Sequence, residues 1–97
     1  MGAIGVVWTT TQVTVTTAAT VVLVANLRRS KVTLIRQGTG GGNIFVGSGA
    51  SVTTANGILI PRIDGYPFSL RNQGDIYAIM QSGGTVTEVV TAMEEYI

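Results

Sequence analysis

Few side chains in this sequence could carry out acid–base chemistry. Proton transfer needs a group that titrates near neutral pH, most often His, or a carboxylate or Lys shifted by burial. The chain has no His and no Cys, and Lys31 is its single lysine. Its many Ser and Thr hydroxyls therefore have no imidazole to activate them. The sequence predicts a protein that is not an enzyme and that has no catalytic residue, no bound cofactor and no metal site.

Each of the five carboxylates either has a structural explanation or has no neighbouring group in the sequence with which it could act in catalysis. Asp64 and Asp75 each adjoin a glycine, which is typical of turns. Glu94 and Glu95 are expected in a solvated tail. A hydrolase would require a pair of close carboxylates that the sequence does not reveal.

The glycine cluster GTGGGN, residues 38–43, invites comparison with phosphate-binding loops. Such loops need a following Lys with Ser or Thr, or G-x-G-x-x-G at the start of a helix. Neither pattern is present, so the cluster is expected to form a turn.

Arg28 and Arg29, with Lys31 close by, form the main basic cluster. One interpretation is a solvated turn between two strands. The other is contact with an acidic patch on a partner protein, because Arg forms bidentate pairs that survive partial desolvation. The net charge of +1 provides no basic face for a phosphate backbone, so no nucleic-acid partner is expected.

Six aromatic residues could form a platform for sugar binding, but they are spread through the chain. Contact in the core or between subunits is the favoured interpretation, and carbohydrate binding is the alternative. The aromatic residues are Trp8, Phe45, Tyr66, Phe68, Tyr77 and Tyr96.

The elements that position these residues belong to a single domain, residues 1–97. Hydrophobic residues make up 45% of the chain and charged residues 11%, against about 25% charged in typical soluble domains. A surface with so little charge predicts burial against other subunits. No apolar run approaches the roughly 18 residues of a membrane span, so no membrane partner is expected.

β-branched residues dominate, and short Gly, Asn and Ser clusters interrupt them, which predicts an all-β fold: a β-sandwich, jelly-roll-like or Ig-like, of about eight mostly antiparallel strands. Turns are expected at 64–65, 72–74 and 82–84. The expected strands are 12–16, 20–25, 31–37, 43–47, 58–60, 67–72, 75–80 and 85–93.

Several details follow from the pattern. Val32, Leu34 and Arg36 share one face of their strand, and the glycine-rich connection predicts a hairpin between 31–37 and 43–47. The apolar run 20–25 predicts a strand that is covered on both faces or that lies at a subunit contact. Under either interpretation the strand is expected to be central. A change of phase at Val89-Val90 predicts a bulge.

Two further segments carry expectations. Pro67 is expected to open a strand or to lie at an edge. Residues 1–10 form either an N-terminal arm that docks on a neighbour or the first strand. Because three threonines follow Trp8 and no basic residue precedes it, this segment is unlike a secretory signal.

The stretch SVTTANGI, residues 51–58, is expected to be an ordered loop. Asn56-Gly57 would supply a tight turn into the next strand, and the Thr pair would bond to backbone groups locally or across a subunit boundary.

From residue 13 to residue 96 the succession of motifs resembles small β-sandwich structural proteins of tailed bacteriophage virions, of the head decoration (cement) or head-fibre type. The motifs are a Thr-rich strand, the turn at Asn26 with Arg28-Arg29, the segments 32–37 and 43–47, the 51–57 loop, and the pair 76–79 and 85–94. The glycine-rich loop 38–43 and the segment RIDGYPF, residues 62–68, depart from the family pattern.

The resemblance implies a decoration protein that binds the outer surface of a phage head at capsomer junctions and stabilises the expanded shell. Its partners would be the phage major capsid protein and itself, as a homotrimer. It would assemble in the bacterial host cytoplasm and reside on the capsid exterior. The alternatives are a host-surface or carbohydrate-binding module displayed on the virion, and a tail or neck subunit. The interface residues expected are Val6, Val7, Trp8, Arg28 and Arg29.

Overall fold

The computed structural model describes residues 7–37, 42–60, 67–81 and 87–96, which form eight strands and no helix. The strands are β1 (Val7–Thr16), β2 (Thr20–Leu23), β3 (Arg29–Gln37), β4 (Ile44–Gly47), β5 (Ile58–Ile60), β6 (Pro67–Leu70), β7 (Ile76–Met80) and β8 (Thr87–Tyr96).

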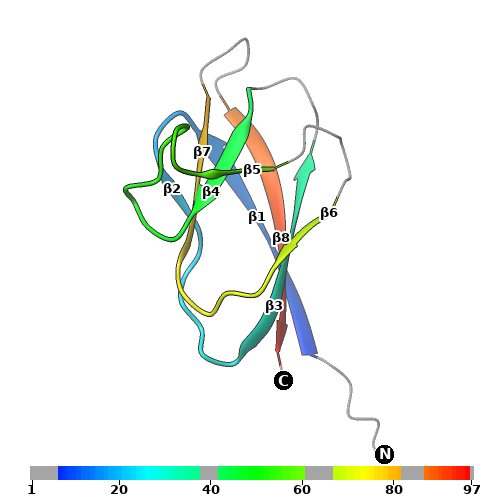
Figure 1. Cartoon of the computed structure of the whole chain (residues 1–97). Helices are drawn as coiled ribbons and strands as arrows, with labels where there is room; N and C mark the ends of the chain where they lie inside the picture. The colour runs from blue at the N-terminus through cyan, green and yellow to red at the C-terminus, as the bar shows by residue number, and fades with distance from the viewer. Residues whose placement is uncertain (1–6, 38–41, 61–66, 82–86, 97) are drawn as a thin grey trace, which may run out of the picture.

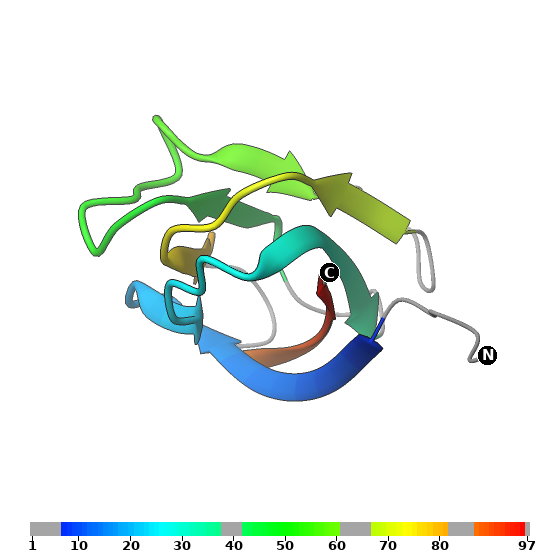
Figure 2. The ribbon, with the colours of Figure 1, turned by 90° about the horizontal axis from the view of Figure 1, so that it is seen from below.

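The strands form two four-stranded antiparallel sheets that pack face to face (Figures 1 and 2). Sheet A has the order β1-β8-β3-β6, and sheet B has the order β2-β7-β4-β5. The chain crosses repeatedly from one sheet to the other, and this order is that of a jelly roll rather than an immunoglobulin domain. The all-β sandwich predicted from the sequence is confirmed.

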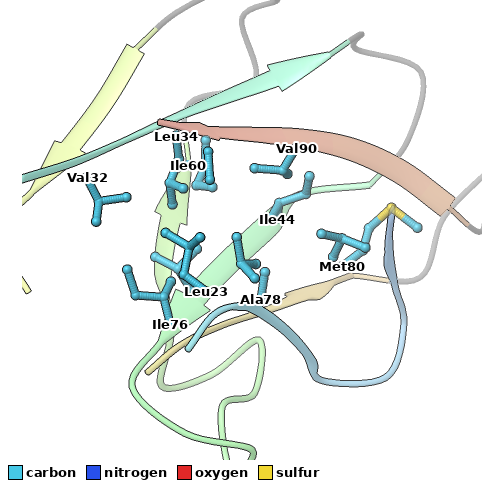
Figure 3. Close-up of a cluster of buried hydrophobic side chains, with 13 residues drawn as sticks. Leu23, Val32, Leu34, Ile44, Ile60, Ile76, Ala78, Met80 and Val90 are labelled. Carbon is cyan, nitrogen blue, oxygen red and sulfur yellow. The ribbon is translucent and has the colours of Figure 1, made fainter. Parts of the chain in front are cut away.

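Alternating side chains of both sheets meet in the core between them (Figure 3). Sheet A contributes residues such as Val32, Leu34 and Val90, and sheet B contributes Ile44 and its neighbours. Because successive side chains of a strand point to opposite faces, every second residue of β7 is buried. The full apolar cluster comprises Val15, Val22, Leu23, Val32, Leu34, Ile44, Val46, Ile60, Ile76, Ala78, Met80, Val90 and Ala92.

The expected strands all exist, and their count is correct. Val32, Leu34 and Arg36 are buried on one face of β3, as the alternation predicted. Pro67 opens β6, which is an edge strand. The turn at 72–74 is also confirmed, since the Gly74 amide donates to Asn72 Oδ1 over 2.7 Å.

The predicted hairpin between 31–37 and 43–47 is wrong. β3 lies in sheet A, where it pairs with β8 and β6, and β4 lies in sheet B, where it pairs with β7 and β5. The glycine-rich connection therefore leads from one sheet to the other, and its residues 38–41 lie outside the described residues.

The run 20–25 is not central. Only 20–23 is a strand, and β2 is the edge of sheet B. Val22 and Leu23 are buried, whereas Val21 and Val24 are exposed. The run is apolar without interruption because its buried residues and its exposed residues are both apolar.

The bulge expected at Val89-Val90 is wrong as well. β8 pairs with β1 and with β3 in unbroken register through these residues. The register shifts instead between Arg29 and Lys31 in β3, and between Val21 and Leu23 in β2.

β1 begins at Val7 and pairs with β8 along its whole length, so residues 7–10 are part of the first strand. Residues 1–6, on which the rest of the arm prediction rests, lie outside the described residues. So do the expected turns at 64–65 and 82–84. The part of the chain that the structure describes has no helix suited to crossing a membrane.

Candidate interaction surfaces

Arg29 is the centre of a buried polar cluster at one end of the sandwich, and only 1% of the residue is exposed. Its Nε donates to Glu94 Oε2 over 2.9 Å. Its Nη1 donates to the carbonyl oxygens of Asn72 and Gly74, and its Nη2 to that of Val24. The guanidinium thus joins the segment after β2, the β6–β7 turn and β8.

This cluster corrects two sequence interpretations. The solvated turn is wrong for Arg29, whereas the exposed side chain of Arg28 is compatible with both interpretations. The solvated tail is wrong for Glu94, which lies in β8 and pairs with Arg29. Asp75 also has a structural role, because its Oδ1 accepts a 2.7 Å hydrogen bond from the Ala25 amide.

A second ion pair lies within the sandwich, where Arg36 Nη2 is 3.3 Å from Glu88 Oε2. The Arg36 side chain is fully buried and that of Glu88 is 11% exposed. Among the described carboxylates, Glu88 and Glu94 are therefore each paired with a buried arginine. The described residues contain no cluster of three or more potential metal ligands.

The 48–57 loop folds back on itself through short hydrogen bonds. Thr53 Oγ1 accepts from the amides of Ala55 and Asn56, and Asn56 Oδ1 accepts from the Thr53 amide. The Gly57 amide then donates to the Thr53 carbonyl over 2.9 Å. The ordered loop and its local bonding are confirmed, and the first threonine of the pair makes the bonds.

Val52 attaches this loop to the outside of sheet B. Its side chain is buried, yet it lies outside the central apolar cluster. A Cβ added to Gly47 would lie 2.7 Å from Val52 Cγ2, and one added to Gly57 would lie 2.7 Å from Phe45 Cβ. The two glycines allow the loop to approach the sheet this closely.

The outer surface of sheet B is apolar across all four strands. Two rows of directly paired residues form it: Val21, Tyr77 and Gly47 in one, and Ile79, Phe45 and Leu59 in the other. Val21 is 41% exposed and Leu59 is 47% exposed. We call Val21, Phe45, Leu59, Tyr77 and Ile79 the sheet B face. It contains no charged residue.

The outer surface of sheet A is different, because hydroxyl and amide groups dominate it. Thr91 Oγ1 accepts from Gln37 Nε2 over 3.0 Å and from Gln12 Nε2 over 3.4 Å. Thr33 and Ser69 are hydrogen-bonded through their hydroxyls. This surface is polar and almost uncharged.

Two concave regions lie elsewhere on the molecule. A groove of about 420 Å³ opens between β5 and β6, lined by Ile58, Phe68, Leu70 and neighbours. A second groove of about 660 Å³ at one end of the sandwich is lined by Leu27, Arg28, Ser30, Arg71 and neighbours. Among the described residues, Phe68 is the one aromatic side chain that lines either groove.

The structure separates the residues expected at an interface. Trp8, on β1, is 60% exposed. Arg28 lines the second groove, whereas the guanidinium of Arg29 is occupied within the chain. Val6 and the side chain of Val7 lie outside the described part of the structure. The sheet B face was not predicted as a unit, because its residues come from four strands whose pairing the sequence does not display.

Comparison with known proteins establishes the fold alone. No family model matches the chain, and none of the curated proteins matches it. A solved structure described as "Bacillus endospore appendages form a novel family of disulfide-linked pili" contains a chain of similar fold, with a TM-score of 0.59. The two sequences are 15% identical, and the similarity covers 98% of this chain and 90% of the other.

Proposed function

We propose that this protein is a non-enzymatic structural subunit of an extracellular or virion assembly, and that it binds its neighbours through uncharged surface. The observation that carries the proposal is the sheet B face. Five apolar or aromatic side chains lie side by side on the outside of a sheet, and two of them, Val21 and Leu59, are 41% and 47% exposed.

The energetics favour burial of this face. Apolar surface removed from water contributes about 25 cal/mol per Å². No charge on the face would have to be desolvated, and desolvation is the main cost of burying ionic surface. A stable interface takes about 800 Å² from each partner, which is roughly one seventh of the 5434 Å² that the chain exposes. The sheet B face and the adjoining 48–57 loop together provide a surface suited to such a contact.

The specific assembly that we propose is a phage head, on which the protein is a decoration subunit at capsomer junctions. This step rests on the resemblance of residues 13–96 to virion sandwich proteins. Copies that bind only the expanded shell would stabilise it by mass action. The homotrimer and the contact with the major capsid protein belong to the same proposal.

A second candidate is a subunit of a surface appendage, which the fold of the endospore pilus chain favours. That structure is named for its disulfide links, whereas this chain has no cysteine. An appendage built from it would be held together without disulfides.

The carbohydrate-binding alternative has less support. A sugar platform needs aromatic side chains gathered on one shallow surface. Phe68 lines the β5–β6 groove, Trp8 is on β1, and Tyr77 and Phe45 are on the outside of sheet B. Among the aromatics named here, only Phe45 and Tyr77 therefore share one surface.

Immunogold labelling distinguishes these candidates. An antiserum against the purified protein is applied to virions and cells from a culture that expresses it. Dense label over phage heads is the result expected for a decoration protein. Label along filaments would instead establish an appendage subunit, and label confined to tails or necks would contradict head decoration. Antigen that remains entirely soluble would overturn the structural role.

A further inference from the structure

The four edge strands of the sandwich are not equally protected against pairing with another chain. Native proteins protect edges with short strands, proline, bulges or charged residues. β5 has three residues, β6 has four and opens with Pro67, and β2 has four with a register shift at Val21. Each of these three edges has at least one protective feature.

β1 has none of them. It is ten residues long, VWTTTQVTVT, with no charged residue and no proline. Its register with β8 is regular from Val7 to Thr16. β8 is its one neighbour in sheet A, so the opposite edge of β1 is unpaired among the described strands. Along that edge, backbone groups of alternate residues point away from β8.

The first half of β1 is also open on both faces. Every residue from Trp8 to Gln12 is exposed, although alternate side chains point to opposite sides of the sheet. Figure 1 shows this part of β1 extending away from sheet B toward the end of the molecule where the chain begins. A second strand can therefore approach this edge without displacing other described elements.

We propose that β1 pairs antiparallel with β1 of a second copy of this chain, which joins two four-stranded sheets A into one sheet of eight strands. The inference rests on the proposed structural role. It specifies that the partner is a second copy of this chain and that the contact uses the unpaired edge of β1. Antiparallel pairing of identical strands is symmetric about a two-fold axis, so each copy uses the edge once and the contact is closed.

The composition of β1 supports a second copy as the partner. Identical strands that carry charge would place like charges opposite one another, which is destabilising, and β1 carries none. Its Thr residues form favourable β-branched cross-strand pairs. Trp8 provides a large exposed side chain to cover the partner strand.

Cysteine scanning tests the pairing directly, because the natural chain has no cysteine and an introduced thiol is unique. Single variants at each position from Trp8 to Gln12 are oxidised mildly, and disulfide-linked dimer is quantified. Two-fold pairing predicts one maximum at the position nearest the axis, with lower yields on both sides. Ser69→Cys, exposed on β6 at the opposite edge of sheet A, gives the background yield. A scan that stays at background from Trp8 to Gln12 overturns the proposal.

A charge variant tests the β1 pairing separately from the proposed structural role of the protein. Thr10→Lys/Gln12→Lys should weaken dimerisation at least about tenfold, because like charges then face each other across the axis. Ala25→Lys/Ser69→Lys adds the same charge at exposed positions outside β1, the sheet B face and its loop, and should have no effect. The association is measured by sedimentation velocity.

The outcomes of this experiment are distinct. If the β1 variant associates like the natural chain while Leu59→Lys on the sheet B face dissociates, edge pairing is wrong and the structural role stands. If the natural chain is monomeric at all concentrations and the antiserum finds no assembly, both proposals fail.

Discussion

Arg28 and Arg29 are neighbours in the sequence, but the structure gives them opposite environments. Arg28 is exposed beside a groove, and Arg29 is buried with one carboxylate and three carbonyl oxygens as acceptors. A buried cation is tolerated only when its donors are satisfied in this way. The planar guanidinium can reach three chain segments at once, which a lysine ammonium cannot do in the same geometry.

Arg29→Ala should therefore destabilise the fold by about 3–5 kcal/mol, since it leaves Glu94 and the three carbonyl groups without their donor. Arg28→Ala should change the free energy of unfolding by less than about 0.5 kcal/mol, because its side chain is exposed. Urea unfolding of both variants, followed by far-UV circular dichroism, measures the difference. Equal stabilities for the two variants would contradict the structural role of Arg29.

The sequence could not distinguish these arginines. Its alternation of apolar and polar residues breaks down near Arg29, because β3 has a register shift between Arg29 and Lys31. The acceptors of Arg29 come from residues 24, 72, 74 and 94, which only the tertiary fold brings together. Arg36 differs, because its position in the β3 alternation correctly placed it on the same face as Val32 and Leu34, which the structure shows to be buried.

At the scale of elements, the 48–57 loop is attached to sheet B by one apolar side chain. Val52 packs where Gly47 leaves room, and Asn56 and Thr53 close the loop around it. The loop therefore borders the sheet B face as a fixed rim.

Gly47→Ala should displace this loop. The new Cβ would lie 2.7 Å from Val52 Cγ2 and 2.9 Å from Val52 Cβ, so the loop must move. We expect a loss of about 1–3 kcal/mol of stability, as is usual for overpacking. Gly49→Ala is the matched control, because nothing lies within 4 Å of its added Cβ.

Thermal unfolding of these two glycine variants tests the contact. Val52→Ala in the Gly47→Ala background should recover part of the loss, because it removes Val52 Cγ2, the atom nearest to the added Cβ. Additive effects of Gly47→Ala and Val52→Ala would show that the two residues do not interact.

Sequence reasoning was most successful for elements with local signals. The strands, the turn at 72–74, the edge position of Pro67 and the closed 51–58 loop all follow from period-two alternation or from the backbone preferences of Gly, Asn and Pro. The failures concern relations between strands. A glycine-rich connection is compatible with a hairpin and with a crossing between sheets, so GTGGG could not reveal that β3 and β4 separate.

At the scale of the whole molecule, the two outer surfaces differ in chemistry. Sheet A presents hydroxyl and amide groups, and sheet B presents an apolar face. The low charge of the sequence predicted an adhesive surface, and the fold places part of its apolar residues on the outside of sheet B, whereas Trp8, Val24 and Leu27 are exposed elsewhere. The direction in which each side chain points depends on strand register, which composition does not contain.

Association through the sheet B face should withstand both salt and reductant. At about 1 M NaCl, where the Debye length is about 3 Å, contacts between exposed charges are largely screened, whereas apolar contacts are not. The absence of cysteine removes any dependence on disulfides. Leu59→Lys should weaken association under both conditions, and sedimentation velocity at low and high salt measures the effect. Dissociation of the natural chain by salt would show that charged groups dominate the contact.

The place of β8 in sheet A has a consequence for how the protein is made. β8 is made after the other seven described strands, yet it lies between β1 and β3 and pairs with both. Until β8 has been made, β1 has no neighbour in its sheet. The core side chains of Val32 and Leu34 are then only partly covered. We therefore expect the sandwich to form only after β8 has been made and to fold slowly, as is typical of chains whose contacts join distant residues.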